Sequence, residues 1–311
     1  MRCSATRGSE GGRFPPWRLS GLAAKVSPVS IRILYVAEIV GKAGVFTVKK
    51  LLATTRRDLK ADFVIGNADS ATGGAGLGRQ HAVYLRKLGL EAMTTGECCY
   101  YKRDIVEQMP KAPYLLRPAN YPYGNPGRGY KVFSCPTASG ERKVAVVQLL
   151  GQAGFSRVHL ANPYQAIIDL ARKLREETPI IILDFHAATT AEKQTMSHHA
   201  SGLVSAVIGS HTKAQTADAR IIRGTAYITD AGRTGSLLSV GGLDPATRIG
   251  EYLSGISAWA KDGTAGLELQ GCLLEIGDDG HAISIEALRI PCTEVLEEKK
   301  AEALPAEDAQ D

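Results

Sequence analysis

The chain has 311 residues and a mass of 33.2 kDa, with 44% hydrophobic and 22% charged residues. This composition is typical of a soluble globular protein and excludes a mostly disordered chain, a collagen and a coiled coil. The net charge of +5 at pH 7 does not by itself indicate a nucleic-acid partner. A membrane-spanning helix needs about 18 consecutive uncharged apolar residues, and no run in the sequence approaches that length. The length suits one large α/β domain, although two smaller domains remain an alternative.

The two ends of the chain differ from its middle. Residues 1–30 hold five basic residues and one acidic residue among many Gly, Ser and Pro, and their apolar stretch is too interrupted for a secretory signal. We expect a disordered basic extension there, with a transit peptide as the weaker alternative. Residues 293–311 hold seven acidic residues, which favours a solvated acidic tail. The folded domain is therefore predicted at 31–292.

Short apolar runs alternate with amphipathic segments through this domain. In 163–177, for example, Ala166, Ile167, Leu170 and Leu174 recur at helical spacing. Strands alternating with helices predict βαβ units and largely parallel pairing. The predicted strands are 31–39, 63–65, 92–95, 144–150, 180–185, 204–208 and 226–229, and the predicted helices include 45–57, 81–88 and 163–177.

The end of the domain has a different pattern. The apolar segments 267–276 and 282–290 flank Gly277-Asp278-Asp279-Gly280, which is typical of a β-hairpin. We therefore expect antiparallel strands to be added in the second half of the chain.

The cysteines indicate a reducing compartment. They are scattered through the chain without a CxxC pair, so they are interpreted as reduced thiols of a cytoplasmic protein rather than a disulfide framework. The six residues are Cys3, Cys98, Cys99, Cys135, Cys272 and Cys292.

Several of the predicted strands end at side chains that can bind metal or phosphate. Open α/β sheets bind ligands beyond the carboxyl ends of their strands, so these side chains could converge. Carboxylates with neutral imidazoles suit a first-row divalent metal. A single strand-end carboxylate is more often a helix N-cap or a solvated turn, but a series on successive strands favours a shared site. The candidates are Glu38, Asp69, Glu97, His186 and His211.

Short motifs in a fixed order carry a resemblance to a known family. They lie at 32–41, 67–71, 76–77, 95–98, 116–122, 184–187, 209–212, 215–218 and 224–232. Together they resemble the bacterial YmdB-like phosphodiesterases of the calcineurin-like metallophosphoesterase superfamily, over about residues 31–292. The resemblance implies an α/β fold of the calcineurin-like metallophosphoesterase type, a four-layer α/β/β/α sandwich. It also implies a two-metal centre that hydrolyses phosphodiesters, including cyclic nucleotides.

The site positions depart from the family pattern. His186 and His211 are unchanged, whereas most of the other positions carry a different residue type. Glu38 replaces an Asp ligand, Asp69 replaces the bridging Glu, Ser70 replaces an Asn, Glu97 replaces an Asn ligand, Cys98 replaces the general-acid His, and Lys213 replaces a His ligand.

These changes affect the two metals of the family differently. For one metal, the aligned positions Asp69, Glu97, His186 and His211 still form a full ligand set for Fe, Mn or Zn. For the other, Ser70 is a poor ligand and the ammonium of Lys213 has donors but no acceptor. We therefore predict one metal per chain, with Lys213 in the place of the second cation, and a metal-free site as the alternative.

The other candidate site residues are given roles as a further metal ligand, as catalytic residues or as substrate contacts. Glu38 is retained as a further candidate metal ligand, and Cys98 and Lys213 as candidate catalytic residues. Asn67, Ser70 and Arg117 are candidates for contacting the substrate. The guanidinium groups of Arg117 and Arg128 could meet a phosphate, or they could form structural ion pairs.

Three function classes follow from this interpretation. The first is a metal-dependent phosphodiesterase that acts on cyclic nucleotides or similar small phosphodiesters, with one metal and weak activity. The second is a catalytically inactive pseudoenzyme that binds a phosphorylated ligand, and the third is an interaction scaffold. The predicted partner is a small phosphodiester or nucleotide; a membrane is not expected, nucleic acid is not indicated, and a homo-oligomer is left open.

Overall fold

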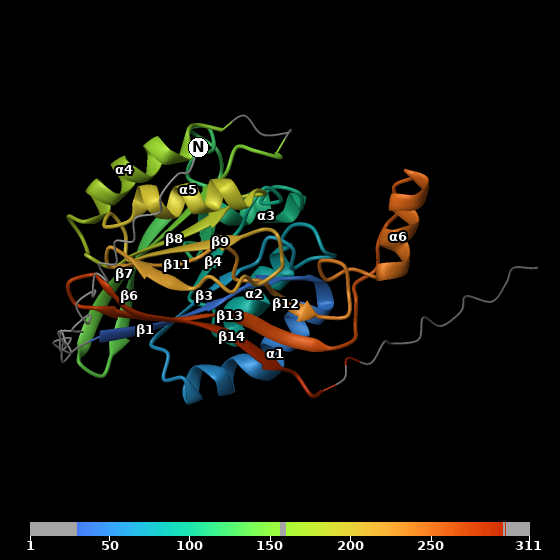
Figure 1. Cartoon of the computed structure of the whole chain (residues 1–311), viewed down its shortest axis with the longest axis horizontal. Helices are drawn as coiled ribbons and strands as arrows, with labels where there is room; N and C mark the ends of the chain where they lie inside the picture. Colours follow the sequence, from blue (N-terminus) through green and yellow to red (C-terminus); the bar gives the residue numbers. More distant parts are fainter. Residues whose placement is uncertain (1–29, 156–159, 295, 297–311) are drawn as a thin grey trace, which may run out of the picture.

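The computed structural model describes residues 30–155, 160–294 and 296. Its strands form two β-sheets that pack face to face, with helices on the outer face of each sheet (Figure 1). The predicted basic extension at 1–30 and the predicted acidic tail at 293–311 lie almost entirely outside the described residues. Within the described part of the chain, no helix is long and apolar enough to span a bilayer.

The first sheet contains the N-terminal strands together with β12, β13 and β14. It separates two hydrophobic cores, as the side chains of β1 show. Ile31, Ile33 and Tyr35 face the second sheet, while Leu34 and Val36 face the helices, because successive side chains of a strand point to opposite faces. β1, β3, β4 and β5 pair in parallel. In order across the sheet the strands are β2 (Glu38–Ile39), β12 (Arg233–Ser236), β13 (Leu267–Gly277), β1 (Ser30–Val36), β3 (Phe63–Asn67), β4 (Ala92–Thr94) and β5 (Leu115–Leu116), and β14 (Ala282–Pro291) pairs with β13.

The second sheet has a parallel centre and antiparallel edges. β7, β8, β9 and β11 pair in parallel, whereas β6 and β10 run antiparallel to their neighbours. The central strands are nearly continuous apolar runs because both of their faces are covered. In order the strands are β10 (Arg220–Ile222), β11 (Thr225–Ile228), β9 (Ala206–Ser210), β8 (Ile181–His186), β7 (Gly140–Leu150) and β6 (Tyr130–Thr137).

Helices complete a four-layer α/β/β/α sandwich. The first sheet is covered by α1 (Gly41–Asp58), α2 (Arg79–Leu88), α3 (Arg103–Gln108) and the 3-10 turn η1 (Met109–Lys111). The second is covered by α4 (Pro163–Leu174) and α5 (Thr190–Ala200). A separate helix, α6 (Pro245–Ser254), projects away from the sandwich and buries none of its residues (Figure 1).

The local sequence explains where α4 begins. The side chain of Asn162 accepts a hydrogen bond from the backbone N–H of Tyr164 at 2.9 Å, and Pro163 occupies the first turn, where its missing N–H costs nothing. Ile167, Ala171 and Leu174 then face the sheet. The predicted helix start is confirmed, and the helix ends at Leu174 rather than at 177.

The parallel pairing and the C-terminal hairpin predicted from the sequence are confirmed, since β13 and β14 pair antiparallel around Gly277–Gly280. Some details differ from the prediction, and the short strands β5, β10 and β12 were not predicted. The apolar run 31–39 forms two strands, because the chain leaves β1 after Val36 and β2 then pairs with β12. The edge strand β6 was not predicted, since exposed Ser134 and Pro136 interrupt its apolar pattern.

Candidate metal centre

Strand ends from both sheets meet at one place. Asp69 follows β3 and Glu97 follows β4 in the first sheet, while His186 ends β8 and His211 follows β9 in the second. Because the carboxyl ends of these strands lie at the same end of the packed sheets, residues far apart in the chain are brought together. Four of the five predicted strand-end residues therefore share one site.

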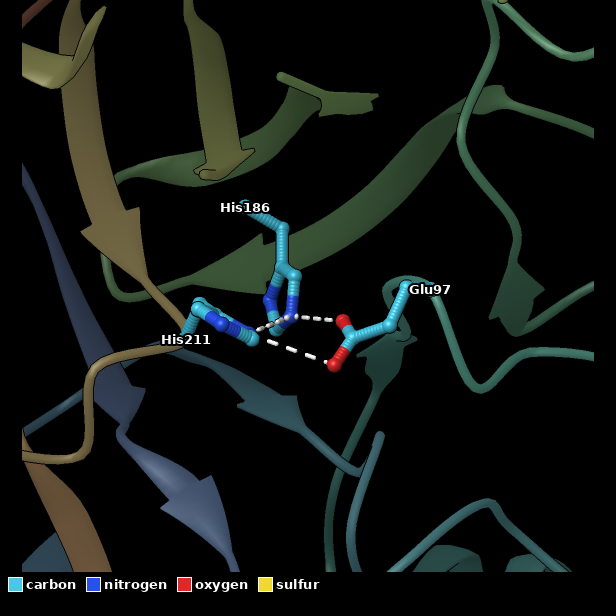
Figure 2. Close-up of side chains that lie close together, drawn as sticks. All are labelled: Glu97, His186 and His211. Carbon is cyan, nitrogen blue, oxygen red and sulfur yellow. Dashed lines mark hydrogen bonds and ion pairs between the residues drawn. The ribbon is translucent and has the colours of Figure 1, made fainter. Parts of the chain in front are cut away.

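Glu97, His186 and His211 form the centre of this site and point toward one another (Figure 2). The Nε2 atom of His186 lies 2.6 Å from Oε2 of Glu97 and 3.1 Å from Nδ1 of His211. Nδ1 of His211 lies 3.3 Å from the other oxygen of Glu97. The three side chains place ligand atoms within 4.8 Å of one another, close enough for all three to bind one ion.

Asp69 adds a second carboxylate to the cluster. It is buried, it accepts hydrogen bonds from the backbone N–H groups of Gly96 at 2.5 Å and Cys98 at 3.2 Å, and its Oδ2 lies 3.8 Å from Nε2 of His186. Burial and the charge of Glu97 raise the pKa of Asp69 to about 8. A side chain on Gly96 would place its Cβ 2.4 Å from the ring of His186, so only glycine lets the loop approach this closely.

A buried hydrogen-bond network fixes the orientation of His186. Oγ of Ser210 donates to Asp184 at 2.7 Å and lies 2.9 Å from Nδ1 of His186. Because the single hydroxyl proton of Ser210 goes to Asp184, the contact to His186 requires a proton on Nδ1. This arrangement directs Nε2 toward Glu97 and leaves it as the ring nitrogen that can bind a metal. Tyr35 donates a further bond to Asp184 at 2.7 Å.

Replacing Ser210 with alanine should therefore weaken metal binding about 10- to 100-fold, the usual cost of losing such a supporting contact. Affinity measured by calorimetric metal titration checks this. The matched control is Ser197→Ala, which removes a buried hydroxyl of α5 that donates to Gln194 O at 2.7 Å. Equal affinity in Ser210→Ala and the wild-type protein would show that Ser210 does not position His186.

Glu38, Ser70 and Lys213 form a separate group beside the cluster. The ammonium of Lys213 lies 3.0 Å from Oε1 of Glu38, and the hydroxyl of Ser70 donates to the same oxygen at 2.5 Å. Burial raises the pKa of Glu38, but Lys213 and His186 lower it further, so the pKa of this carboxyl falls below its usual value. Glu38 is thus paired with Lys213 and is not among the clustered metal-ligating atoms.

The loop between His211 and Lys213 is held in an unusual backbone conformation. His211 has φ of 100° and Lys213 has φ of 60°, in the region that L-residues rarely adopt. Asp230 holds this loop by accepting a bond from the N–H of Thr212 at 3.0 Å, and Lys193 of α5 lies 2.6 Å from the same oxygen. The buried Lys193–Asp230 pair thus holds the loop so that His211 faces the metal cluster and Lys213 faces Glu38. Sequence reasoning did not identify this pair, because Lys193 lies outside the family motifs and no pattern links it to Asp230, which lies within the motif 224–232.

Three other predicted site residues lie around the centre in different ways. Cys98 is buried next to Asp69, and burial together with the nearby carboxylates raises the pKa of its thiol well above the usual value. Asn67 is fully buried and donates to Asp184 at 3.1 Å and Ser210 at 3.3 Å, so it faces the supporting network rather than an incoming substrate. Arg117 is also buried and lies outside the cluster, where it donates to the backbone oxygen of Pro118 at 2.7 Å.

Phe155 was not identified from the sequence, yet it forms an aromatic wall of the site. Its ring centroid lies 5.1 Å from that of His211 in an edge-to-face contact, and 6.3 Å from that of His186. The only sequence signal is an aromatic residue shortly after the carboxyl end of a predicted strand, which is too common to indicate a site.

Similarity to known proteins places this arrangement in a family. The sequence profile described as "YmdB-like protein" matches residues 34–288. The chain belongs to the YmdB-like protein family. A Bacillus subtilis relative, a 2′,3′-cyclic-nucleotide 2′-phosphodiesterase, is 34% identical over 262 residues, which cover 84% of this chain and 97% of that protein.

Two solved structures confirm the predicted fold class. A phosphatase from Mycoplasma pneumoniae is 30% identical with a TM-score of 0.77, covering 85% of this chain and 94% of that one. A hypothetical protein from Thermus thermophilus is 27% identical with a TM-score of 0.75, covering 84% of this chain and 99% of that one. The chain is therefore a calcineurin-like metallophosphoesterase in fold, as the sequence motifs predict.

The described side chains of this site fit a divalent ion. Glu97, His186 and His211, with Asp69 beside them, offer two carboxylates and two imidazoles. Beside this group, the hydroxyl of Ser70 is donated to Glu38 and the ammonium of Lys213 has donors but no acceptor, so neither side chain suits a metal.

Metal binding to this cluster should strengthen as the pH rises from roughly 6.5 toward 9. Burial lowers the pKa of His186, but Glu97 and Asp69 raise it further, to about 9, and the pKa of Asp69 is also raised. A metal must therefore displace at least one proton at neutral pH, so a higher pH favours binding. Calorimetric titrations in buffers of different ionisation enthalpy measure this release, and an affinity independent of pH with no proton release would contradict the expectation.

Proposed function

We propose that this chain hydrolyses small phosphodiesters, including cyclic nucleotides, with one divalent metal held by Asp69, Glu97, His186 and His211. The observation that carries the proposal is the convergence of Glu97, His186 and His211 within ligand distance of one another. The activity of the Bacillus subtilis relative supports the substrate class. The mixture of carboxylates and imidazoles supports Fe, Mn or Zn.

A divalent ion bound by these side chains would supply the Lewis acidity that polarises a phosphoryl oxygen. The chain itself supplies a fixed positive charge at Lys213, whose side chain is 19% exposed and whose ammonium is anchored by Glu38. That charge can attract a phosphate oxygen, while Ser210 and Asp184 hold His186 in place. Phe155 gives the site an apolar side next to His211.

Cys98 is proposed as a weak proton donor in place of the general-acid histidine. Burial and the nearby carboxylates of Asp69 and Glu97 keep the pKa of its thiol far above neutrality. The thiol therefore stays protonated near pH 7. Because its pKa is far above the working pH, it is an inefficient general acid. Together with the single metal, this predicts weak activity.

The test is turnover of 2′,3′-cyclic AMP and of bis(4-nitrophenyl) phosphate by purified protein loaded with Mn, Fe or Zn. The expected result is slow hydrolysis that requires metal and stops when a chelator is added. No turnover with any of these metals, together with thermal stabilisation by the same nucleotides, would contradict the proposal and identify a pseudoenzyme that binds phosphorylated ligands.

Two further predictions from the sequence are retained as proposals. The five cysteines in the described residues are all free, which supports a reducing compartment such as the cytoplasm. Self-association is supported by the exposed apolar side chains of the α6 region, Tyr252, Leu253 and Trp259, which are 84%, 83% and 91% exposed. Light scattering of the purified protein would distinguish an oligomer from a monomer.

A further inference from the structure

A cavity whose lining contains none of the candidate metal ligands lies at the edge of the sandwich. It has a volume of about 670 Å³ and lies between the start of β6, the segment after β5, and α4. Its β6 wall is separated from the strand of His186 by β7, because β6 pairs with β7 and β7 pairs with β8. None of the clustered metal-ligating residues lines it; its walls include Pro110, Arg117, Ala119, Arg128, Tyr130 and Leu170.

Two guanidinium groups line this cavity without a carboxylate partner. Arg117 is 8% exposed and donates only to the backbone oxygens of Pro118 at 2.7 Å and Asn125 at 3.4 Å. Its Nε–H is buried with no partner, and a guanidinium has five N–H donors, so most of its donors are unused. Among the described residues, no carboxylate forms an ion pair with Arg117 or Arg128.

The positive charge at this edge also affects the pKa of the neighbouring Lys131. Burial, together with the charges of Arg128 and Arg86, lowers the pKa of Lys131 on β6. The one acidic residue in the cavity wall, Asp169, does not compensate for this charge, since its side chain is 79% exposed and its nearest cation is Arg172 at 3.9 Å. A largely buried cation without a counter-ion is unfavourable, so a bound anion would stabilise this region.

We propose that this cavity is a binding site for a phosphate monoester, independent of the metal centre. The planar donor fork of an arginine matches the oxygens of a phosphate and can bind two of them at once. Pro110, Leu170 and the ring of Tyr130 form an apolar side that can accept a ring attached to the phosphate, such as a nucleobase. Free phosphate and a nucleoside monophosphate share the chemistry that Arg117 and Arg128 recognise.

The test uses the full chain with its metal removed by a chelator, so that the metal centre does not contribute to phosphate binding. Calorimetric titrations with inorganic phosphate and with adenosine 5′-monophosphate should each show one site per chain. Arg128→Ala should lower both affinities at least tenfold. Arg172→Ala, which removes an arginine of α4 whose side chain is 77% exposed, should leave both unchanged. Tighter binding of the nucleotide than of phosphate would identify a nucleotide site, and equal binding a phosphate site.

Two results would overturn the proposal: no binding of either probe to the wild-type chain, or equal loss of affinity in Arg128→Ala and Arg172→Ala. The backbone oxygen of Arg128 accepts a bond from the N–H of Arg117, and this contact does not need the side chain, so the variant should fold. If it does not, Arg128→Lys replaces it, since lysine keeps the charge and loses the fork. An affinity unchanged in Arg128→Lys would then contradict recognition by the guanidinium.

Discussion

Replacing His186 with alanine should remove the bound metal and lower phosphodiesterase activity at least about 100-fold, because metal-assisted hydrolysis depends on the ion. His186 has the central position in the cluster: its Nε2 is 2.6 Å from Glu97, 3.1 Å from His211 and 3.8 Å from Asp69. It is fully buried, so alanine would also leave two carboxylates facing each other without the imidazole between them.

The readouts are metal content per chain and kcat/KM for a cyclic nucleotide. His186→Asn keeps part of the side-chain volume and should show the same loss, which separates metal binding from packing. His198→Ala is the matched control, since it removes an exposed histidine of α5 in the same half of the sandwich. Full metal content and full turnover in His186→Asn would exclude His186 as a ligand.

Replacing Lys213 with methionine should destabilise the fold by about 3–5 kcal/mol, the usual cost of leaving one charge of a buried pair without its partner. Glu38 is completely buried, its Oε2 atom has no partner among the described residues, and Lys213 forms the ion pair with its Oε1. Once the ammonium is removed, the carboxylate can only stay charged at high cost or take up a proton.

Urea denaturation of the chelator-treated protein measures this effect. Glu38→Gln combined with Lys213→Met should recover most of the lost stability, because the buried charge is removed together with its partner. Lys49→Met, at an exposed position of α1, is the control and should change stability by less than about 0.5 kcal/mol. Equal stability of Lys213→Met and the control would show that Lys213 does not balance the charge of Glu38.

The sequence predicts the components of the site better than their partners. Asp69, Glu97, His186 and His211 could be identified because each follows an apolar run of strand length, and the geometry of packed sheets brings such strand ends together. Glu38 has the same sequence pattern, yet its side chain pairs with Lys213. Whether a strand-end carboxylate faces a metal or a neighbouring ammonium depends on a contact 175 positions along the chain, which periodicity cannot reveal.

The supporting contacts were the least predictable part of the site. Lys193 belongs to a polar helix segment, and only the tertiary packing of α5 brings it to Asp230. Asn67 lies in a family motif at a strand end, but its side chain turns inward to Asp184 and Ser210. In the fold, β1 was predictable from its apolar run and the C-terminal hairpin from its turn residues, whereas the edge strand β6 lacked a clear apolar pattern.

Elemental metal analysis of the purified chain, after loading with Mn, Fe or Zn, tests whether the site holds a single metal. We expect about one metal per chain, lost in His186→Ala and in His211→Ala, with Lys213 as the second positive charge. Glu97 belongs to both groups of potential metal ligands, Glu97–His186–His211 and Asp69–Glu97–Cys98. Two metals per chain would contradict the role of Lys213 and restore an ordinary two-metal centre, and no bound metal would contradict the metal site itself.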